Sequence, residues 1–251
     1  MSSLRRSLCA LIFTSACSLT AQSANLTVSA AASLSNAMQD IAPLFEAANP
    51  GTKLHLNIAA SGDLLQQIAK GAPVDVFVSA DPDTMDQAQT KGLVLAAQRR
   101  NIVANSLVVI VPVAQTRVPK SLADLAQPGY ARIAIGLPAS VPVGHYAKAA
   151  LQAAGLWSAI EPKMIAVQIP RQGLDYVVRG EVDAAFVYAT DAALMPAKVK
   201  VAFTVDTPTP IVYPAAPVSA SAQPAMAQRF VSFLLSAPAQ SVLARYGFRK
   251  L

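Results

Sequence analysis

Apolar runs and amphipathic stretches alternate along most of this chain. Residues 26–33 and 54–61 each form an apolar run that leads directly into a stretch with apolar side chains at helical spacing, and residues 74–80 form a third such run. This alternation is typical of βαβ units, in which neighbouring strands run parallel and helices cover the sheet. The pattern therefore predicts an α/β fold.

The first two units end their strands in the same way. Alanines lead into a serine, Ser33 in the first unit and Ser61 in the second. The first N–H groups of a helix lack intrahelical partners, so each turn offers backbone donors beside a hydroxyl. If the two strands are neighbours in a parallel sheet, both turns face one crevice, and the pair predicts an oxyanion site. The alternative is that each serine only caps its own helix.

The rest of the chain continues the alternation. Its predicted strands and helices fall at 105–112, 132–136, 144–151, 171–178, 184–188, 211–218, 225–235 and 239–246. Pro214 and Pro217 indicate that the strand at 211–218 lies at a sheet edge or is irregular.

No low-complexity linker separates two sequential domains. Crossing strands near 103–106 and 210–213 instead favour two lobes. Lobe I is predicted to contain residues 25–104 plus 212–251, and lobe II residues 105–211.

Residues 1–24 have the pattern of a secretory signal peptide. Arg5 and Arg6 precede a short apolar run, and small residues follow it. The run is too short to span a membrane, so we expect an exported, periplasmic protein. A lipoprotein anchored through Cys17 is the alternative, but Thr14 stands where that motif usually has leucine. Both cysteines of the chain lie in this segment, so the remaining 227 residues must be stabilised by core burial rather than by disulfides.

Net charge and the absence of known motifs limit the classes of function that this chain can have. Without the two signal-peptide arginines the net charge falls from +6 to +4, and no basic stripe suits nucleic acid. The chain lacks the G-x-S-x-G, H-E-x-x-H, C-x-x-C and P-loop motifs, which favours a binding protein over an enzyme. A hydrolase that uses Ser33 or Ser61 is the alternative from another class. An acidic cluster is assigned to helix capping, with Asp81 as N-cap and Pro82 as first helical residue, rather than to a metal site.

Two further features of the second half offer hydrogen-bond donors. The turn at 137–146 is rich in proline and glycine and precedes a helix, so it is expected to expose the N–H groups of Val143 and Gly144. Tyr188 ends an apolar strand, where its ring can be buried while its hydroxyl reaches a crevice. The alternative for Tyr188 is a core tyrosine with a structural partner.

These residues carry a resemblance to a known family. The segments 30–41, 71–81, 105–111, 141–148, 180–191 and 245–248, in this order, resemble the periplasmic molybdate-binding proteins of ABC transporters. The resemblance implies a type II periplasmic binding protein, with two α/β lobes of mixed, mainly parallel sheets and a two-stranded hinge.

It also implies the residues of the site. The hydroxyls of Ser33, Ser61 and Tyr188 and the backbone N–H of Val143 fall on the family's donor positions. A fifth donor, a backbone N–H, falls on Pro170, which has none. Either the site lacks this bond, or a neighbouring amide such as that of Arg171 replaces it.

The implied function is capture of molybdate, and of tungstate, for the permease of an ABC importer. The protein would act as a monomer, without a cofactor and without a direct protein ligand to the molybdenum. A site made only of donors disfavours protonated phosphate, which needs an acceptor. Another tetrahedral oxyanion or a small organic anion is the alternative ligand.

Overall fold

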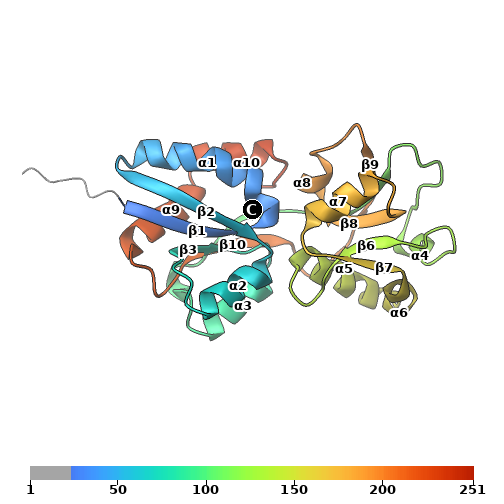
Figure 1. The fold of residues 1–251 in the computed structure, drawn as a ribbon, viewed down its shortest axis with the longest axis horizontal. Coiled ribbons are helices and arrows are strands. Elements are labelled where there is room, and N and C mark those ends of the chain that lie inside the picture. Colours follow the sequence, from blue (N-terminus) through green and yellow to red (C-terminus); the bar gives the residue numbers. More distant parts are fainter. Residues whose placement is uncertain (1–23) are drawn as a thin grey trace, which may run out of the picture.

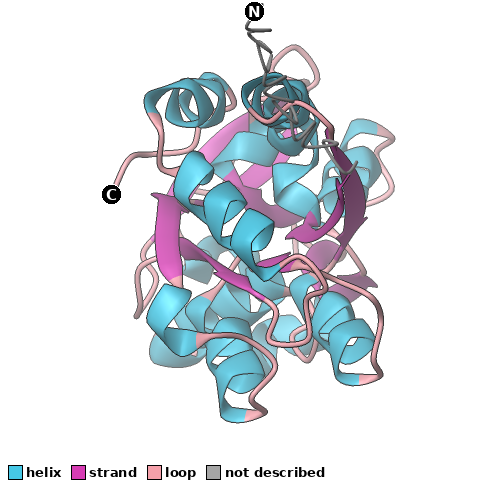
Figure 2. Cartoon of the chain, turned by 90° about the vertical axis from the view of Figure 1, so that its left-hand side faces the viewer, coloured by secondary structure: helices cyan, strands magenta, loops and turns pink. Residues whose placement is uncertain are grey.

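The computed structural model describes residues 24–251, so the predicted signal peptide and Cys17 lie outside the described residues, except for Ala24. The fold contains two five-stranded sheets, each with helices on both faces (Figures 1 and 2). In the first sheet the order is β2-β1-β3-β10-β4, and in the second it is β7-β6-β8-β5-β9. In each sheet β10 or β5 runs against the other four strands, so both sheets are mixed and mainly parallel, as predicted.

The first sheet and its helices, here called lobe I, are built from both ends of the described chain. The strands are β1 (Ala24–Ala31), β2 (Thr52–Ala59), β3 (Val76–Val78), β4 (Arg100–Ala104) and β10 (Val212–Pro217). The helices are α1 (Ser35–Ala48), α2 (Ser61–Ala69), α3 (Pro82–Thr90), α9 (Pro224–Leu234) and α10 (Ala237–Arg245), with the 3₁₀ turns η1 (Ala32–Leu34) and η2 (Ala96–Gln98). Apolar side chains of α2 and α3 cover one face of the sheet, and those of α1, α9 and α10 cover the other.

The second sheet and its helices form lobe II. The strands are β5 (Leu107–Pro112), β6 (Ile133–Gly136), β7 (Met164–Val167), β8 (Ala184–Tyr188) and β9 (Val199–Val205). The helices are α4 (Leu122–Leu125), α5 (Pro142–Ala153), α6 (Trp157–Ile160), α7 (Pro170–Val178) and α8 (Ala189–Ala192), with the 3₁₀ turn η3 (Glu161–Lys163). In β5, Val108 and Ile110 pack in the cluster formed with α7, whereas Val109 and Val111 pack in the cluster formed with α5. Successive side chains point to opposite faces, which explains why this strand is a continuous apolar run.

The chain passes between the lobes twice, from β4 to β5 and from β9 to β10 (Figure 1). The predicted lobe boundaries, at 104/105 and 211/212, fall within these two connections. The Asn105 N–H donates to the Ile211 carbonyl at 2.9 Å and joins the two crossing segments. That they act as the hinge stays a prediction.

The position of the return strand β10 differs from one of the two expectations. It is an interior strand between β3 and β4, not an edge strand. The prolines are accommodated because the register shifts between Tyr213 and Pro214, a β-bulge, and because Pro217 is the last residue of the strand. The alternative expectation, an irregular segment, is therefore the correct one.

Candidate functional site

The two serine-containing turns lie at the same edge of the first sheet. Strands β1 and β2 are parallel neighbours in register from Ala24 with Thr52 to Ala31 with Ala59, so their carboxyl ends meet. Ser33 follows β1 within η1, and Ser61 is the first residue of α2. The predicted juxtaposition of the two turns is confirmed.

Neither serine caps its helix. The helices α1 and α2 have no side-chain cap at Leu34 and Ala60, so the capping interpretation is wrong. The Oγ of Ser61, fully buried, accepts the N–H of Ala80 at 3.0 Å. Since a hydroxyl can donate as well as accept, the proton of Ser61 is left for another acceptor.

Ser33 belongs to a small hydrogen-bonded network. Its Oγ lies 3.0 Å from the hydroxyl of Tyr213, a fully buried residue of β10. The same hydroxyl accepts from Nδ2 of Asn105 at 3.1 Å, and Nδ2 also donates to Oγ1 of Thr190 at 3.0 Å. This network links Ser33, through Tyr213, to Asn105 in the β4–β5 connection and to Thr190 of lobe II.

The N-terminus of α5 faces the Ser61 turn from lobe II. The N–H of Gly62 donates to the carbonyl of Ser140 across the lobes at 3.2 Å, and an added Cβ on Gly62 would lie 2.7 Å from that oxygen. Val143 is the second residue of α5, so its N–H has no intrahelical acceptor. The expectation for Gly144 is wrong, because its N–H donates to the Val141 carbonyl at 2.9 Å. Val143 is therefore the donor that this turn offers.

The N-terminus of α7 faces the Ser33 turn. Helix α7 begins at Pro170, is preceded by Ile169, and packs against η1. Pro170 contributes no N–H, so the first backbone donor of this helix is Arg171. The guanidinium of Arg171 also donates to Oδ1 of Asn36 in α1 at 3.3 Å, which links the two lobes.

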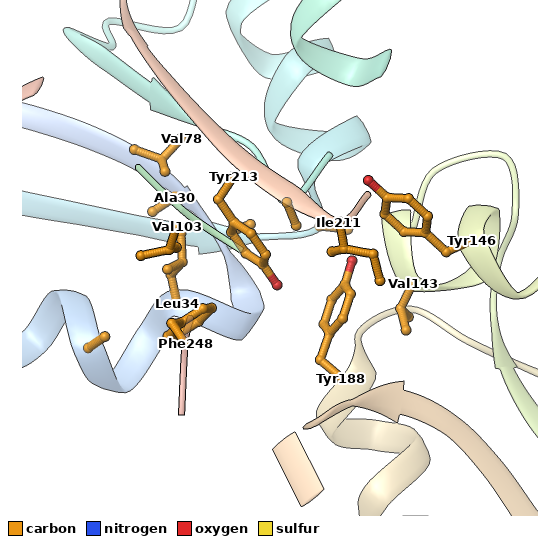
Figure 3. Close-up of a cluster of buried hydrophobic side chains, with 14 of the residues drawn as sticks. Ala30, Leu34, Val78, Val103, Val143, Tyr146, Tyr188, Ile211, Tyr213 and Phe248 are labelled. Carbon is orange, nitrogen blue, oxygen red and sulfur yellow. The ribbon is translucent and has the colours of Figure 1, made fainter. Parts of the chain in front are cut away.

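Tyr188 has a buried hydroxyl without a hydrogen-bond partner. It ends β8, is 1% exposed, and its ring centroid lies 5.9 Å from that of Tyr213 (Figure 3). Burial raises the pKa of Tyr188 well above its usual value, so the hydroxyl keeps its proton and acts as a donor. The ring of Tyr188 belongs to the hydrophobic core, as the alternative expected, but within residues 24–251 the hydroxyl lacks the structural partner that this alternative requires.

Two tyrosines that the sequence analysis did not select also reach this region. Tyr213 holds Ser33, and Tyr146 of α5 carries a second buried hydroxyl without a partner (Figure 3). Tyr213 lies in an apolar run and Tyr146 on the buried face of α5, where a tyrosine is indistinguishable from a core residue by pattern. Burial again raises the pKa of each phenol above its usual value.

Asp81, from the predicted acidic cluster, has a structural role in the described part of the chain. Asp81 is the N-cap of α3, as predicted, and its Oδ1 accepts the N–H of Thr84 at 2.6 Å. Asp81, Asp83 and His145 form the one group within residues 24–251 whose potential metal-ligating atoms lie within 4.8 Å of one another. Because the Asp81 carboxylate is already bonded to both the N–H and the hydroxyl of Thr84, we assign it to the cap.

The hydrolase alternative lacks its base. The hydrogen bonds of Ser33 and Ser61 among the described residues go to Tyr213 and Ala80. His145 instead faces Asp83, with 4.0 Å between Nδ1 and Oδ2. Neither serine is arranged as an activated nucleophile.

Comparison with known proteins agrees with this architecture. The family model of bacterial extracellular solute-binding proteins matches residues 26–249. The chain belongs to the bacterial extracellular solute-binding proteins. Members of this family deliver solutes to transporters and are not enzymes, and the predicted resemblance is confirmed. None of the helices in residues 24–251 combines the length and apolarity needed to cross a membrane.

Three individual proteins show which solute-binding proteins this chain resembles. The molybdate-binding protein ModA of Escherichia coli is 37% identical over 246 residues, which cover 95% of this chain and 94% of ModA. The substrate-binding domain of a putative molybdenum ABC transporter from Clostridium difficile superposes with a TM-score of 0.70 at 33% identity, over 91% of this chain and all of that one. The sulfate-binding protein SubI of Mycobacterium tuberculosis has a TM-score of 0.79 at 20% identity, covers 91% of this chain and 87% of its own, and shares the fold.

Proposed function

We propose that this solute-binding protein captures molybdate, and tungstate, in the periplasm and delivers it as a monomer to the permease of an ABC importer. The observation that supports this most is the unpartnered buried hydroxyl of Tyr188, whose ring lies beside Tyr213, the hydrogen-bond partner of Ser33, and near Val143 of α5 (Figure 3). Homology to ModA proteins supports the choice of anion. The two lobes would close over the anion about the crossing segments and so present a surface to the permease.

The proposed donors are all neutral. The hydroxyls of Ser33, Ser61 and Tyr188 and the N–H of Val143 provide fixed dipoles rather than a mobile cation. Fixed N–H and O–H donors solvate an anion and set the size of its cavity. Molybdate and tungstate share charge, tetrahedral shape and size, so we expect the same site to hold both, whereas sulfate and phosphate are smaller and fit its donors less well.

Calorimetric titration of the ligand-stripped protein tests this function. We expect molybdate and tungstate to bind at one anion per chain with similar affinity, and sulfate and phosphate to bind at least about 100-fold more weakly, which is about 2.7 kcal/mol. Absence of heat with molybdate, or sulfate binding as tightly as molybdate, would overturn the proposal. Tight binding of a small organic anion instead would support the alternative ligand.

Tyr188→Phe separates a ligand role from a structural one. Because the hydroxyl has no hydrogen-bond partner among the described residues, we expect the melting temperature without ligand to stay the same or rise. Molybdate should bind about 10- to 100-fold more weakly, since a hydrogen bond to a charged group contributes about 1.5–3 kcal/mol. A thermal shift assay with and without molybdate measures both effects. A lower melting temperature without ligand and an unchanged shift with molybdate would contradict the ligand role.

Pro170→Ala is expected to tighten molybdate binding by roughly tenfold. The substitution restores an N–H at the start of α7, and a hydrogen bond from it to the anion contributes about 1.5–3 kcal/mol of binding. Release of the proline constraint on the unfolded chain lowers the stability of the fold by about 0.4–1 kcal/mol and does not change the affinity. Surface plasmon resonance should show slower release at a similar association rate. An unchanged or weaker affinity would mean that the Arg171 amide already fills this position, or that the anion does not reach α7.

A further inference from the structure

The inference concerns Tyr146 and rests on the proposed function. Among the described residues, five buried side-chain atoms lack a hydrogen-bond partner, and two of these are the hydroxyls of Tyr146 and Tyr188. A buried hydroxyl without a partner destabilises the folded state, and native proteins contain few. Two of them on adjoining elements of one lobe therefore require an explanation.

Tyr146 comes from the helix whose N-terminus supplies Val143. The two residues are three positions apart in α5, so they lie on the same side of the helix. The ring of Tyr146 is 6% exposed, and its hydroxyl points toward Ile211 in the segment that crosses between the lobes (Figure 3). The hydroxyl of Tyr188 points toward the same segment from β8 (Figure 3). Helix α5 packs against β8, so the two phenols face one region.

The charges around Tyr146 keep its hydroxyl protonated. Burial raises the pKa of this phenol above its usual value, and the carboxylates of Asp81 and Asp83 raise it further. The hydroxyl is a donor at every physiological pH. A phenylalanine would fill the same space without leaving an unpartnered polar atom, so packing alone does not account for a tyrosine here.

We propose that the Tyr146 hydroxyl donates a hydrogen bond to the bound oxyanion, as a further donor of this site. The donor set of this chain is then the hydroxyls of Ser33, Ser61, Tyr146 and Tyr188 with the N–H of Val143.

Tyr146→Phe tests this assignment in the full exported chain. We expect the variant to bind molybdate about 10- to 100-fold more weakly in calorimetry, with an equal or higher melting temperature without ligand. The matched control is Tyr130→Phe, which removes from another buried tyrosine a hydroxyl that donates to the Arg117 carbonyl at 2.8 Å. The control should keep the affinity for molybdate and lose stability.

The outcomes separate this inference from the proposed function. If the wild type binds molybdate and Tyr146→Phe binds it with the same affinity, the role of Tyr146 is overturned and the proposed function stands. Absence of molybdate binding to the wild type would overturn both.

Discussion

Asp191→Asn is expected to raise the free energy of unfolding at pH 8 by on the order of 4 kcal/mol. Asp191 lies in the short helix α8, is 3% exposed, and accepts the N–H of Tyr188 at 3.3 Å. Burial raises the pKa of this carboxyl from 3.8 to about 7, while the Tyr188 N–H and the charge of Arg171 oppose the rise. Asparagine keeps an acceptor for the Tyr188 N–H and removes the cost of a buried negative charge.

The sign of the pH dependence follows from proton binding. Between pH about 4 and about 7 the folded state holds a proton on Asp191 that the unfolded state has released. The free energy of unfolding of the wild type therefore falls as pH rises through this window. The cost of ionising Asp191 is absent below pH about 4 and complete above pH about 7. The advantage of Asp191→Asn should shrink steadily as pH is lowered from 8 toward 4.

Urea unfolding of the ligand-free protein at pH 4.5, 6 and 8 measures this effect. The exposed Asp206→Asn is the matched control and should follow the wild type at all three values. An Asp191→Asn curve parallel to that of the wild type would show that Asp191 is ionised without cost in the folded protein.

Ser61→Ala is expected to weaken both the fold and the binding of molybdate. The substitution leaves the Ala80 N–H buried without its acceptor, which costs about 1–3 kcal/mol of stability. Loss of the hydroxyl as a donor to the anion costs a further 1.5–3 kcal/mol of binding, about 10- to 100-fold in affinity.

Ser33→Ala is the matched comparison for Ser61→Ala. Its partner Tyr213 keeps the hydrogen bond from Asn105, so the melting temperature without ligand should fall less than in Ser61→Ala. The loss of affinity should be similar in both variants. Calorimetry with melting curves of the ligand-free proteins measures the two effects, and wild-type affinity in either variant would exclude that serine from the site.

Local patterns predicted the part of the fold that depends on neighbouring residues. The parallel pairing of β1 with β2, and the meeting of their serine turns, followed from two matching βα units in sequence. The interior position of β10 did not follow, because its neighbours β3 and β4 are far away in the chain and the β-bulge at Tyr213 is a tertiary feature. Proline in a strand indicated an irregularity but not its location in the sheet.

The residues of the candidate site also divide into those with a local sequence signature and those that depend on tertiary contacts. Ser33, Ser61 and Val143 could be selected because a helix start has a local signature. The acceptor role of Ser61 toward Ala80 could not, since that bond joins two separate turns. Tyr146 and Tyr213 were missed because a buried tyrosine has the same pattern whether or not its hydroxyl has a partner.

A crystal structure of the protein with molybdate tests the central claim most directly. Anomalous scattering from molybdenum would locate the anion, and we expect it between the lobes with its oxygens within hydrogen-bond distance of the hydroxyls of Ser33, Ser61 and Tyr188 and of the Val143 N–H. No lysine or arginine side chain should contact it. Molybdenum bound elsewhere, or held between the lobes by a cationic side chain in place of these donors, would contradict the claim.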